Sequence, residues 1–250
     1  MIIDIHAHLG WDFTFEELFA KELLIDKMNK NDVIQIVQPG TTHDIERARS
    51  QHNEIAKLSK SFPGKFFGMA APNPHTEDKK YEDEITRCVE DLEFIAIKLH
   101  TYATGVHPNS KCGRKVFNIA QRYRIPVMVH TGSGVPFAAP INLVPVAKDY
   151  PNVKIIMAHC GSMILADEAA TALSLCPNIY GDTSWTAGYL LLNWVRAYGP
   201  KIMFASDLAD NFETELAKIK TYGFTTDEQK SIFETTALNV FNLKAKLNKS

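Results

Sequence analysis

Two histidines stand two residues apart near the start of the chain, in the run Asp4-Ile5-His6-Ala7-His8. Residues two apart on a β-strand point to the same face, so both imidazoles can bind one metal ion. A single His-x-His is weak evidence, because two polar residues at the end of a strand give the same pattern. It gains weight when other strands end in the same way.

Three further, mostly apolar runs also end in a residue type that binds metals or moves protons. These residues are His130, His159 and Asp207. Any one of them alone could be a hydrogen-bonded residue that closes a strand. Together with His6 and His8, they predict a cluster of imidazoles and a carboxylate at the carboxyl ends of parallel strands, where the active sites of α/β barrels lie.

A sheet of parallel strands is needed to bring these residues together. Short β-branched runs alternate with helical patterns along the chain, as in repeated βα units. The expected strands are residues 2–6, 33–38, 66–71, 94–100, 126–130, 153–159, 178–182 and 201–206. The expected helices are residues 15–30, 45–62, 79–92, 114–123, 142–149, 164–175, 189–198 and 213–222.

The number of strand-like runs favours a closed barrel over an open, doubly wound sheet. No Gly-x-Gly-x-x-Gly motif follows the first run, as a dinucleotide-binding open sheet would usually need. The length of 250 residues also fits one barrel. The sequence therefore predicts an α/β protein with a single (β/α)8 TIM barrel over residues 1–250, including a C-terminal helical extension from residue 226.

Several longer motifs carry the candidate residues. They are Asp4-Ile5-His6-Ala7-His8, Ile97-Lys98-Leu99-His100, Val129-His130-Thr131-Gly132, Ala158-His159-Cys160-Gly161, Asn178-Ile179-Tyr180-Gly181-Asp182-Thr183-Ser184 and Ser206-Asp207. In this order the chain resembles the amidohydrolase superfamily, and more closely its branch related to aminocarboxymuconate-semialdehyde decarboxylase. The resemblance covers essentially the whole chain and implies a metal-dependent enzyme.

The resemblance implies four metal ligands by order and strand position: His6, His8, His130 and Asp207. It implies that His159 is the catalytic histidine. Three imidazoles and a carboxylate with an open position can lower the pKa of a bound water from 15.7 to about 7. We expect one Zn²⁺, although Mn²⁺ or Fe²⁺ would accept the same ligands. Asp207 would also take a proton from the attacking water, and His159 would act as a general acid or base.

Lys98 is a separate candidate on the fourth expected strand. A lysine among apolar residues is costly to bury unless it is paired or modified. In superfamily members with two metals, a carboxylated lysine on this strand bridges the ions, and the strand-six histidine binds the second ion. Lys98 and His159 would supply that arrangement. The favoured alternative has one metal, with Lys98 orienting the substrate or pairing with a carboxylate such as Asp4 or Asp207.

The remaining histidines carry weaker predictions. His100 lies on the fourth expected strand and should form hydrogen bonds inside the barrel rather than bind the metal. His43, His75 and His107 fall in expected rim loops, where solvated polar residues are common. His52 is expected on the surface of a helix.

The loops after the expected strands would supply the wall of the pocket. Aromatic side chains in these loops include Trp11, Phe13, Tyr102, Phe137 and Trp185. The loops are fairly short, so the site should take a small molecule. A strongly anionic substrate would be held by the metal or by one of three arginines near helix starts: Arg47, Arg49 and Arg114.

The overall charge favours a small-molecule substrate. The 27 Lys+Arg residues nearly balance the 29 Asp+Glu residues, which predicts neither a nucleic-acid nor a membrane partner. The four cysteines form no CxxC pair, and we expect reduced thiols in a cytoplasmic protein without a targeting or membrane-spanning segment. Apolar helix surface could support a homo-oligomer.

Three functions fit these expectations. The first is hydrolysis of a small amide, lactone or ester-like bond by metal-activated water. The alternative, implied by the family branch, is non-oxidative decarboxylation of a small unsaturated or aromatic carboxylic acid. The third is a non-catalytic metal-binding barrel, which is weakened by the open coordination position, because structural zinc sites are usually closed by four protein ligands.

Overall fold

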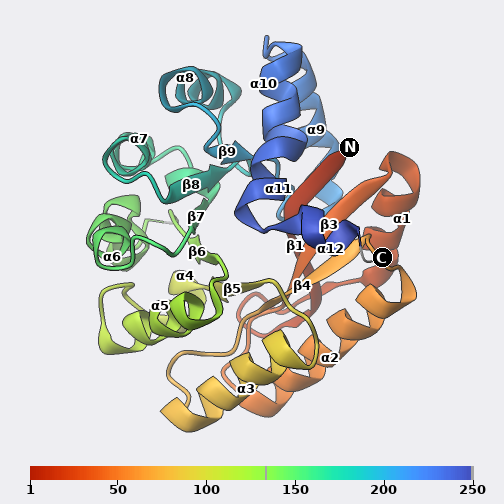
Figure 1. Ribbon diagram of the computed structural model, residues 1–250, viewed down its shortest axis with the longest axis vertical. Helices are drawn as coiled ribbons and strands as arrows, with labels where there is room; N and C mark the ends of the chain where they lie inside the picture. The colour runs from red at the N-terminus through yellow and green to blue at the C-terminus, as the bar shows by residue number, and fades with distance from the viewer. Residues whose placement is uncertain (133, 249–250) are drawn as a thin grey trace.

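The computed structural model describes residues 1–132 and 134–248, and nine strands form one curled sheet within them (Figure 1). The strands are β1 (Ile2–Asp12), β2 (Glu17–Phe19), β3 (Val33–Pro39), β4 (Phe66–Ala70), β5 (Ala96–Leu99), β6 (Val127–His130), β7 (Ile155–Ala158), β8 (Ile179–Asp182) and β9 (Ile202–Met203). Their order in the sheet is β2-β1-β3-β4-β5-β6-β7-β8-β9. The β1–β2 pair is antiparallel and the other neighbouring pairs are parallel.

The sheet closes on itself between β1 and the segment that follows β9. The Ile5 amide donates to the Phe204 carbonyl at 3.1 Å, and the Asp207 amide donates to the His6 carbonyl at 2.8 Å. Ala7 and Asp207 form a parallel bridge at the same seam. The parallel strands β1 and β3–β9 therefore make the predicted (β/α)8 barrel, and the fold prediction is confirmed.

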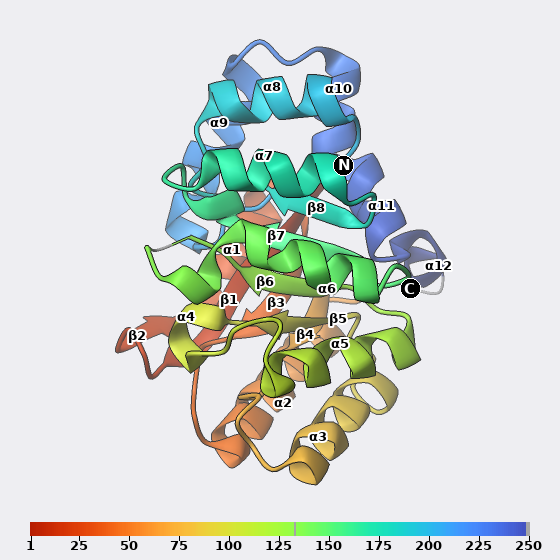
Figure 2. The same ribbon diagram turned by 90° about the vertical axis from the view of Figure 1, so that its left-hand side faces the viewer.

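Helices surround the barrel (Figure 2). They are α1 (Lys21–Asn31), α2 (Ile45–Ser61), α3 (Asp78–Glu90), α4 (Thr101–Thr104), α5 (Lys111–Tyr123), α6 (Leu143–Asp149), α7 (Ala166–Leu175), α8 (Gly188–Tyr198), α9 (Phe212–Thr221), α10 (Thr226–Lys230), α11 (Thr236–Val240) and α12 (Leu243–Leu247), with a π-helical turn at Ser231–Thr235. In the described part of the chain, none of them is long and apolar enough to cross a membrane. The four cysteines are free thiols, as expected.

The first helix begins later than its sequence pattern predicts. Residues 15–30 were expected to be helical, but Glu17–Phe19 form β2 against the end of β1, and α1 follows. The buried carboxylate of Asp12 fixes the turn between them, because it accepts hydrogen bonds from backbone N–H groups of the turn and from Thr41. The result is a hairpin at the carboxyl end of β1.

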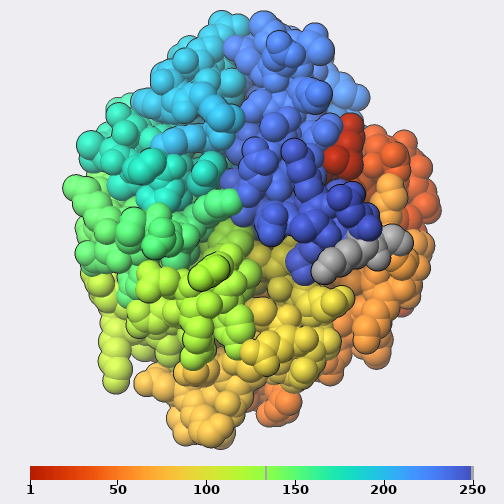
Figure 3. Space-filling view, in the orientation of Figure 1, coloured from red at the N-terminus to blue at the C-terminus, as the bar shows by residue number. Residues whose placement is uncertain are grey.

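The core has two layers because side chains alternate along the strands. Ile34 and Ile36 of β3 point into the barrel, whereas Val33 and Val37 pack under the surrounding helices. Leu238 of α11, Leu243 of α12 and Phe241 between the two helices join the inner layer. These helices cover the end where the strands begin, beside the N-terminus (Figures 1 and 3).

His52 is buried, so its prediction as a helix-surface residue was wrong. It lies on the inner face of α2, where its Nδ1–H donates to the Glu84 carboxylate of α3 at 2.7 Å. Its Nε2 accepts the Ala71 amide at 3.0 Å, just after β4. Cys88 lies beside this pair. Because both ring nitrogens already have partners, the cluster ties two helices to a strand end.

Candidate metal centre and active site

Three ligand atoms meet at the carboxyl end of the barrel. The Nε2 atoms of His6 and His8 are 3.3 Å apart, and Oδ1 of Asp207 is 3.1 Å from each of them. Two ligand atoms that bind one ion at about 2.1 Å lie about 3.0–3.4 Å apart, so the observed spacing suits a shared ion. His6, His8 and Asp207 therefore form the centre of the candidate site.

A β-bulge allows β1 to supply both core side chains and ligands. The pairing of β1 with β3 shifts register after Asp4. Toward the N-terminal side of the bulge, Ile3 and Ile5 point into the inner core. Toward its C-terminal side, His6 and His8 point into the barrel. Such bulges re-aim side chains next to active sites.

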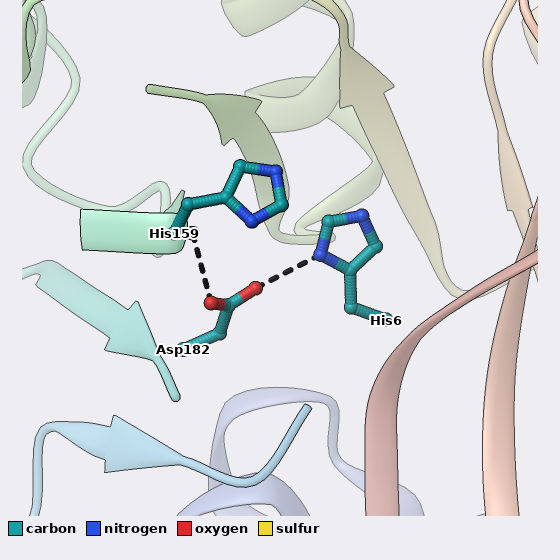
Figure 4. A group of neighbouring side chains, drawn as sticks. All are labelled: His6, His159 and Asp182. Carbon is teal, nitrogen blue, oxygen red and sulfur yellow. Dashed lines mark hydrogen bonds and ion pairs between the residues drawn. The ribbon is translucent and has the colours of Figure 1, made fainter. Parts of the chain in front are cut away.

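Asp182, at the end of β8, fixes the ring of His6. Its Oδ2 accepts a hydrogen bond from Nδ1 of His6 at 2.9 Å (Figure 4). Burial raises the pKa of Asp182, but its Oδ1 accepts the amide of His159 at 2.8 Å and the hydroxyl of Ser184 at 2.7 Å. A carboxylate on the far nitrogen of a ligating histidine sets its tautomer and orientation.

The protonation of His6 shows why the cluster fits a cation. Burial, and then the Lys98 charge, hold the pKa of His6 well below its usual range, so the ring is neutral. Its single proton is on Nδ1, so Nε2 presents a lone pair to the Asp207 carboxylate. Burial opposes ionisation of Asp207, but the pKa of Asp207 lies well below its usual range, so the group is a carboxylate. Two lone pairs facing each other favour a cation between them, and Zn²⁺, Mn²⁺ and Fe²⁺ all accept these ligands.

His159 lies beside this cluster, immediately after β7. Its Nδ1 is 2.9 Å from the hydroxyl of Ser184, which donates its own proton to Asp182. Nδ1 of His159 must therefore carry the proton, and Nε2 is left as the acceptor. The His159 ring centroid is 5.2 Å from that of His6, and burial lowers the pKa of His159 to about 4.

His130, the remaining predicted ligand, lies further along the rim. Its ring stacks on His100 with centroids 4.4 Å apart and meets the ring of His159 edge-on at 4.8 Å. The close group of His6, His8 and Asp207 does not include it. His100 accepts the Ala103 amide through Nδ1, in keeping with its expected hydrogen-bonding role.

Lys98 of β5 is buried and points into the site. Its Nζ lies 2.9 Å from Nε2 of His6, and burial lowers its pKa to about 8 despite the nearby carboxylates. Within the described residues, no ion pair joins it to Asp4 or Asp207, so that expected pairing is not found. Asp4 instead accepts the Ser206 hydroxyl at 2.6 Å, and burial raises its pKa to about 7.

Aromatic side chains cover the cluster. Phe15 of the hairpin stacks on Tyr102 with centroids 6.0 Å apart, and Phe19 lies 5.0 Å from the ring of His8. The indole of Trp185 donates to Oδ2 of Asp207 at 2.7 Å. Cavities of about 20 and 80 Å³ flank the cluster, whereas a cavity of about 590 Å³ lies outside the barrel between α3 and α5.

The expected arginines are mostly engaged elsewhere. Arg114 donates to Asp149 at 2.6 Å, and Nε of Arg49 lies 3.2 Å from Glu84. The guanidinium of Arg47 lies 4.4 Å above the ring of Phe13 near the hairpin. The metal site is thus the stronger candidate for holding an anionic group.

A family model described as Amidohydrolase matches residues 3–243. The chain belongs to the amidohydrolase family. The predicted membership of the superfamily is confirmed, and a search of curated proteins finds no match to this amidohydrolase. The family is one of metal-dependent enzymes, so the expectation of an enzyme stands.

Solved structures share the fold of this amidohydrolase at low sequence identity. A 2,6-dihydroxybenzoate decarboxylase from Rhizobium has a TM-score of 0.79 and 16% identity, covering 97% of this chain and 99% of its own. A 5-carboxyvanillate decarboxylase from Novosphingobium aromaticivorans, complexed with manganese and a nitrobenzoic acid, has a TM-score of 0.77 and 14% identity. The match covers 97% of this chain and 96% of that one. A 4-oxalomesaconate hydratase from Rhodopseudomonas palustris has a TM-score of 0.75 and 18% identity. The match covers 100% of this chain and 98% of that one.

Two residues of this amidohydrolase site were missed as individual candidates. Asp182 ends a strand in a carboxylate, the same pattern that singled out Asp207, so the sequence held a signal for it. Gln38 ends β3 with its amide against His6 and His8. Glutamine is common in many settings, and no pattern in the sequence marks it.

Proposed function

We propose that the protein is a metal-dependent carboxy-lyase, which removes carbon dioxide from a small unsaturated or aromatic carboxylic acid without an oxidant. The observation that carries the proposal is the position of His159, a buried imidazole held by Ser184 and Asp182 beside the ligand cluster. A group so placed can transfer a proton at a carbon next to a carboxylate held by the ion. Two structural neighbours are named decarboxylases, which supports this function over hydrolysis.

We propose that His6, His8 and Asp207 hold the ion, with His130 as a further ligand. When bound, the ion would supply a Lewis acid that withdraws electron density from oxygen atoms of the substrate. Zn²⁺ remains the expectation from the ligand types, and Mn²⁺ is equally compatible with imidazole and carboxylate. One neighbour was solved with manganese, so both metals belong in the first experiment.

The proposed reaction breaks the bond between the carboxylate carbon and its neighbouring carbon. Nε2 of His159, which is unprotonated in the resting site, first takes up a proton from solvent. The electron pair stays on the neighbouring carbon, carbon dioxide leaves, and His159 delivers that proton to the same carbon through Nε2. His159 returns to its neutral form, so the net change is carboxylate plus one solvent proton to carbon dioxide and a product with hydrogen in place of the carboxylate. The contact of Ser184 with Nδ1 leaves Nε2 of His159 available for this proton transfer.

The aromatic rim suits a flat substrate. Phe15 and Tyr102 lie parallel, with an interplanar angle of 5°, and Phe15 also lies 6.2 Å from the His100 ring. An unsaturated or aromatic ring could stack on such side chains once they move apart. Arg49 and Arg114 are engaged with other carboxylates, so the carboxylate of the substrate would be held at the metal.

The test is turnover by protein loaded with Mn²⁺ or Zn²⁺ in D2O, with hydroxybenzoates and short unsaturated acids as substrates. We expect carbon dioxide and a product with deuterium at the carbon that lost it. His159→Gln should lower kcat at least about 100-fold with metal content unchanged, whereas His107→Gln in a rim loop should retain activity.

Other outcomes would select the competing functions. Oxygen from ¹⁸O-labelled water in the product, without carbon dioxide, would indicate hydrolysis of an amide or lactone, or hydration of a double bond. Protein that binds metal but turns over neither acids nor lactones and amides would match the non-catalytic barrel. Lack of metal binding after reconstitution would contradict the proposal at its base.

A further inference from the structure

Gln38 brings a buried amide into the ligand cluster from the end of β3. Its side chain is 1% exposed, and its Nε2 lies 2.8 Å from Nε2 of His6 and 2.5 Å from Nε2 of His8. These are the two imidazole atoms that face Asp207. The amide therefore adjoins the same point as the three ligand atoms already described.

The other end of the amide has nothing to bond. Oε1 of Gln38 is buried and accepts no hydrogen bond from any residue in the described ranges. A buried amide oxygen without a donor is destabilising, so such a group in a native protein needs a reason. A half-turn about the last bond exchanges the oxygen and the nitrogen of the amide with almost no change in shape.

The lone pairs of the imidazoles determine which end suits each partner. The NH2 group can donate to Nε2 of His6, which is unprotonated because Nδ1 donates to Asp182. A cation on the same lone pairs would repel those amide hydrogens. The turned amide would instead present Oε1, and neutral carbonyl oxygens are accepted ligands of Mn²⁺-type cations.

Gln35 of the same strand provides a contrast. It is equally buried, but it faces outward, and its Nε2 donates to the Leu24 carbonyl at 2.9 Å. Gln35 thus joins β3 to α1 and does not approach the site. The two glutamines form a matched pair in which only Gln38 meets the imidazoles.

We propose that Oε1 of Gln38 is a further ligand of the ion held by His6, His8 and Asp207. The inference rests on the proposed metal centre and adds a neutral oxygen from a strand that sequence reasoning left without a role. Gln38 would raise the affinity for oxygen-seeking metals such as Mn²⁺ and raise the coordination number of the ion.

The experiment measures Mn²⁺ and Co²⁺ affinity by competition with a chelator, together with the visible spectrum of the Co²⁺ form. Gln38→Leu should weaken Mn²⁺ binding about tenfold or more and intensify the Co²⁺ bands, as expected when an ion loses a ligand. Gln38→Glu keeps an oxygen at the same place and should restore the affinity. Gln35→Leu should leave affinity and spectrum unchanged.

The failures can be told apart. Equal affinities and spectra for the native protein and Gln38→Leu, with binding abolished in Asp207→Ala, would overturn the role of Gln38 and leave the metal centre intact. Equal losses in Gln38→Leu and Gln38→Glu would also overturn it, because both variants lack the NH2 group and only one lacks the oxygen. If the native protein bound neither metal, the proposed centre itself would fail.

Discussion

At the scale of single residues, Asp182 determines which nitrogen of His6 faces the ligand cluster. Its hydrogen bond to Nδ1 leaves the Nε2 lone pair toward Asp207. Asp182→Asn keeps the shape but allows the amide NH2 to face Nδ1 and favour the other tautomer. We expect metal affinity to fall about 10–100-fold, measured by chelator competition. Asp149→Asn on α6 is the control, and an unchanged affinity in Asp182→Asn would contradict the role of the carboxylate.

Trp185 holds the other oxygen of Asp207. Its indole donates to Oδ2 at 2.7 Å, while Oδ1 faces the histidines and the Asp207 backbone has a φ of 65°. Trp185→Phe should leave Asp207 less well oriented and weaken metal binding several-fold, because partners of ligating carboxylates tune affinity. Metal titration should change the tryptophan fluorescence of the native protein, and that change should be smaller in the variant. A Trp194→Phe variant, altered in a buried helix, should keep the full change.

The sequence predicted the residues of the site better than their geometry. His6, His8 and Asp207 were predicted from strand-end positions, and they do meet. The bulge in β1 could not be foreseen, because alternation along a regular strand would not place both Ile5 and His6 toward the barrel interior. The position of the Gln38 amide could not be foreseen either, because only the folded structure brings it close to two imidazoles.

At the scale of elements, the pair His52–Glu84 joins α2, α3 and the end of β4. Burial alone would raise the pKa of Glu84, but hydrogen bonds from His52 and Arg87 lower it to about 2. Because the folded pKa is depressed, this stabilisation is present above the ordinary value of 4.5 and disappears as the pH falls toward 2. Burial also lowers the pKa of His52. Protonation of this histidine therefore further reduces the stability of the folded protein as the pH falls below the ordinary value of 6.5.

Urea unfolding of native protein and Glu84→Gln at pH 7 and pH 3 measures this contribution. The difference in unfolding free energy between them should shrink by roughly 2 kcal/mol at pH 3, because each pKa unit corresponds to about 1.4 kcal/mol. Glu77→Gln, at an exposed position, should show no such change. A difference that is the same at both pH values would mean that the native carboxylate does not titrate as described.

Element boundaries show what local sequence patterns miss. The eight strand-like runs correspond to the parallel strands of the barrel, because their β-branched content reflects burial on both faces. The hairpin strand β2 was predicted as part of a helix, since its pairing with residues 10–12 depends on contacts that a local pattern does not contain. Likewise, His52 was misplaced because the polar partner that allows its burial lies on the next helix.

At the scale of the whole molecule, the two ends of the barrel have different tasks. The carboxyl ends of the strands carry the ligand cluster, while the other end is covered by α11 and α12, whose apolar side chains join the inner core. Lys154, just before β7, also donates to the Asn239 and Val240 carbonyls at this end. Substitutions at the covered end should therefore lower the free energy of unfolding without changing metal binding or catalysis.

Phe241→Ala tests this separation. The ring is 3% exposed in the inner core, so its removal should lower the free energy of unfolding by about 3–5 kcal/mol. Metal affinity at 25 °C should stay within about twofold of native, because the cavity opens at the opposite end from His6 and Asp207. Asp207→Ala should give the reverse result, with metal binding lost and unfolding of the metal-depleted protein changed far less than by Phe241→Ala. Parallel losses of stability and affinity in Phe241→Ala would mean that the helical cover and the metal centre are energetically coupled through the barrel.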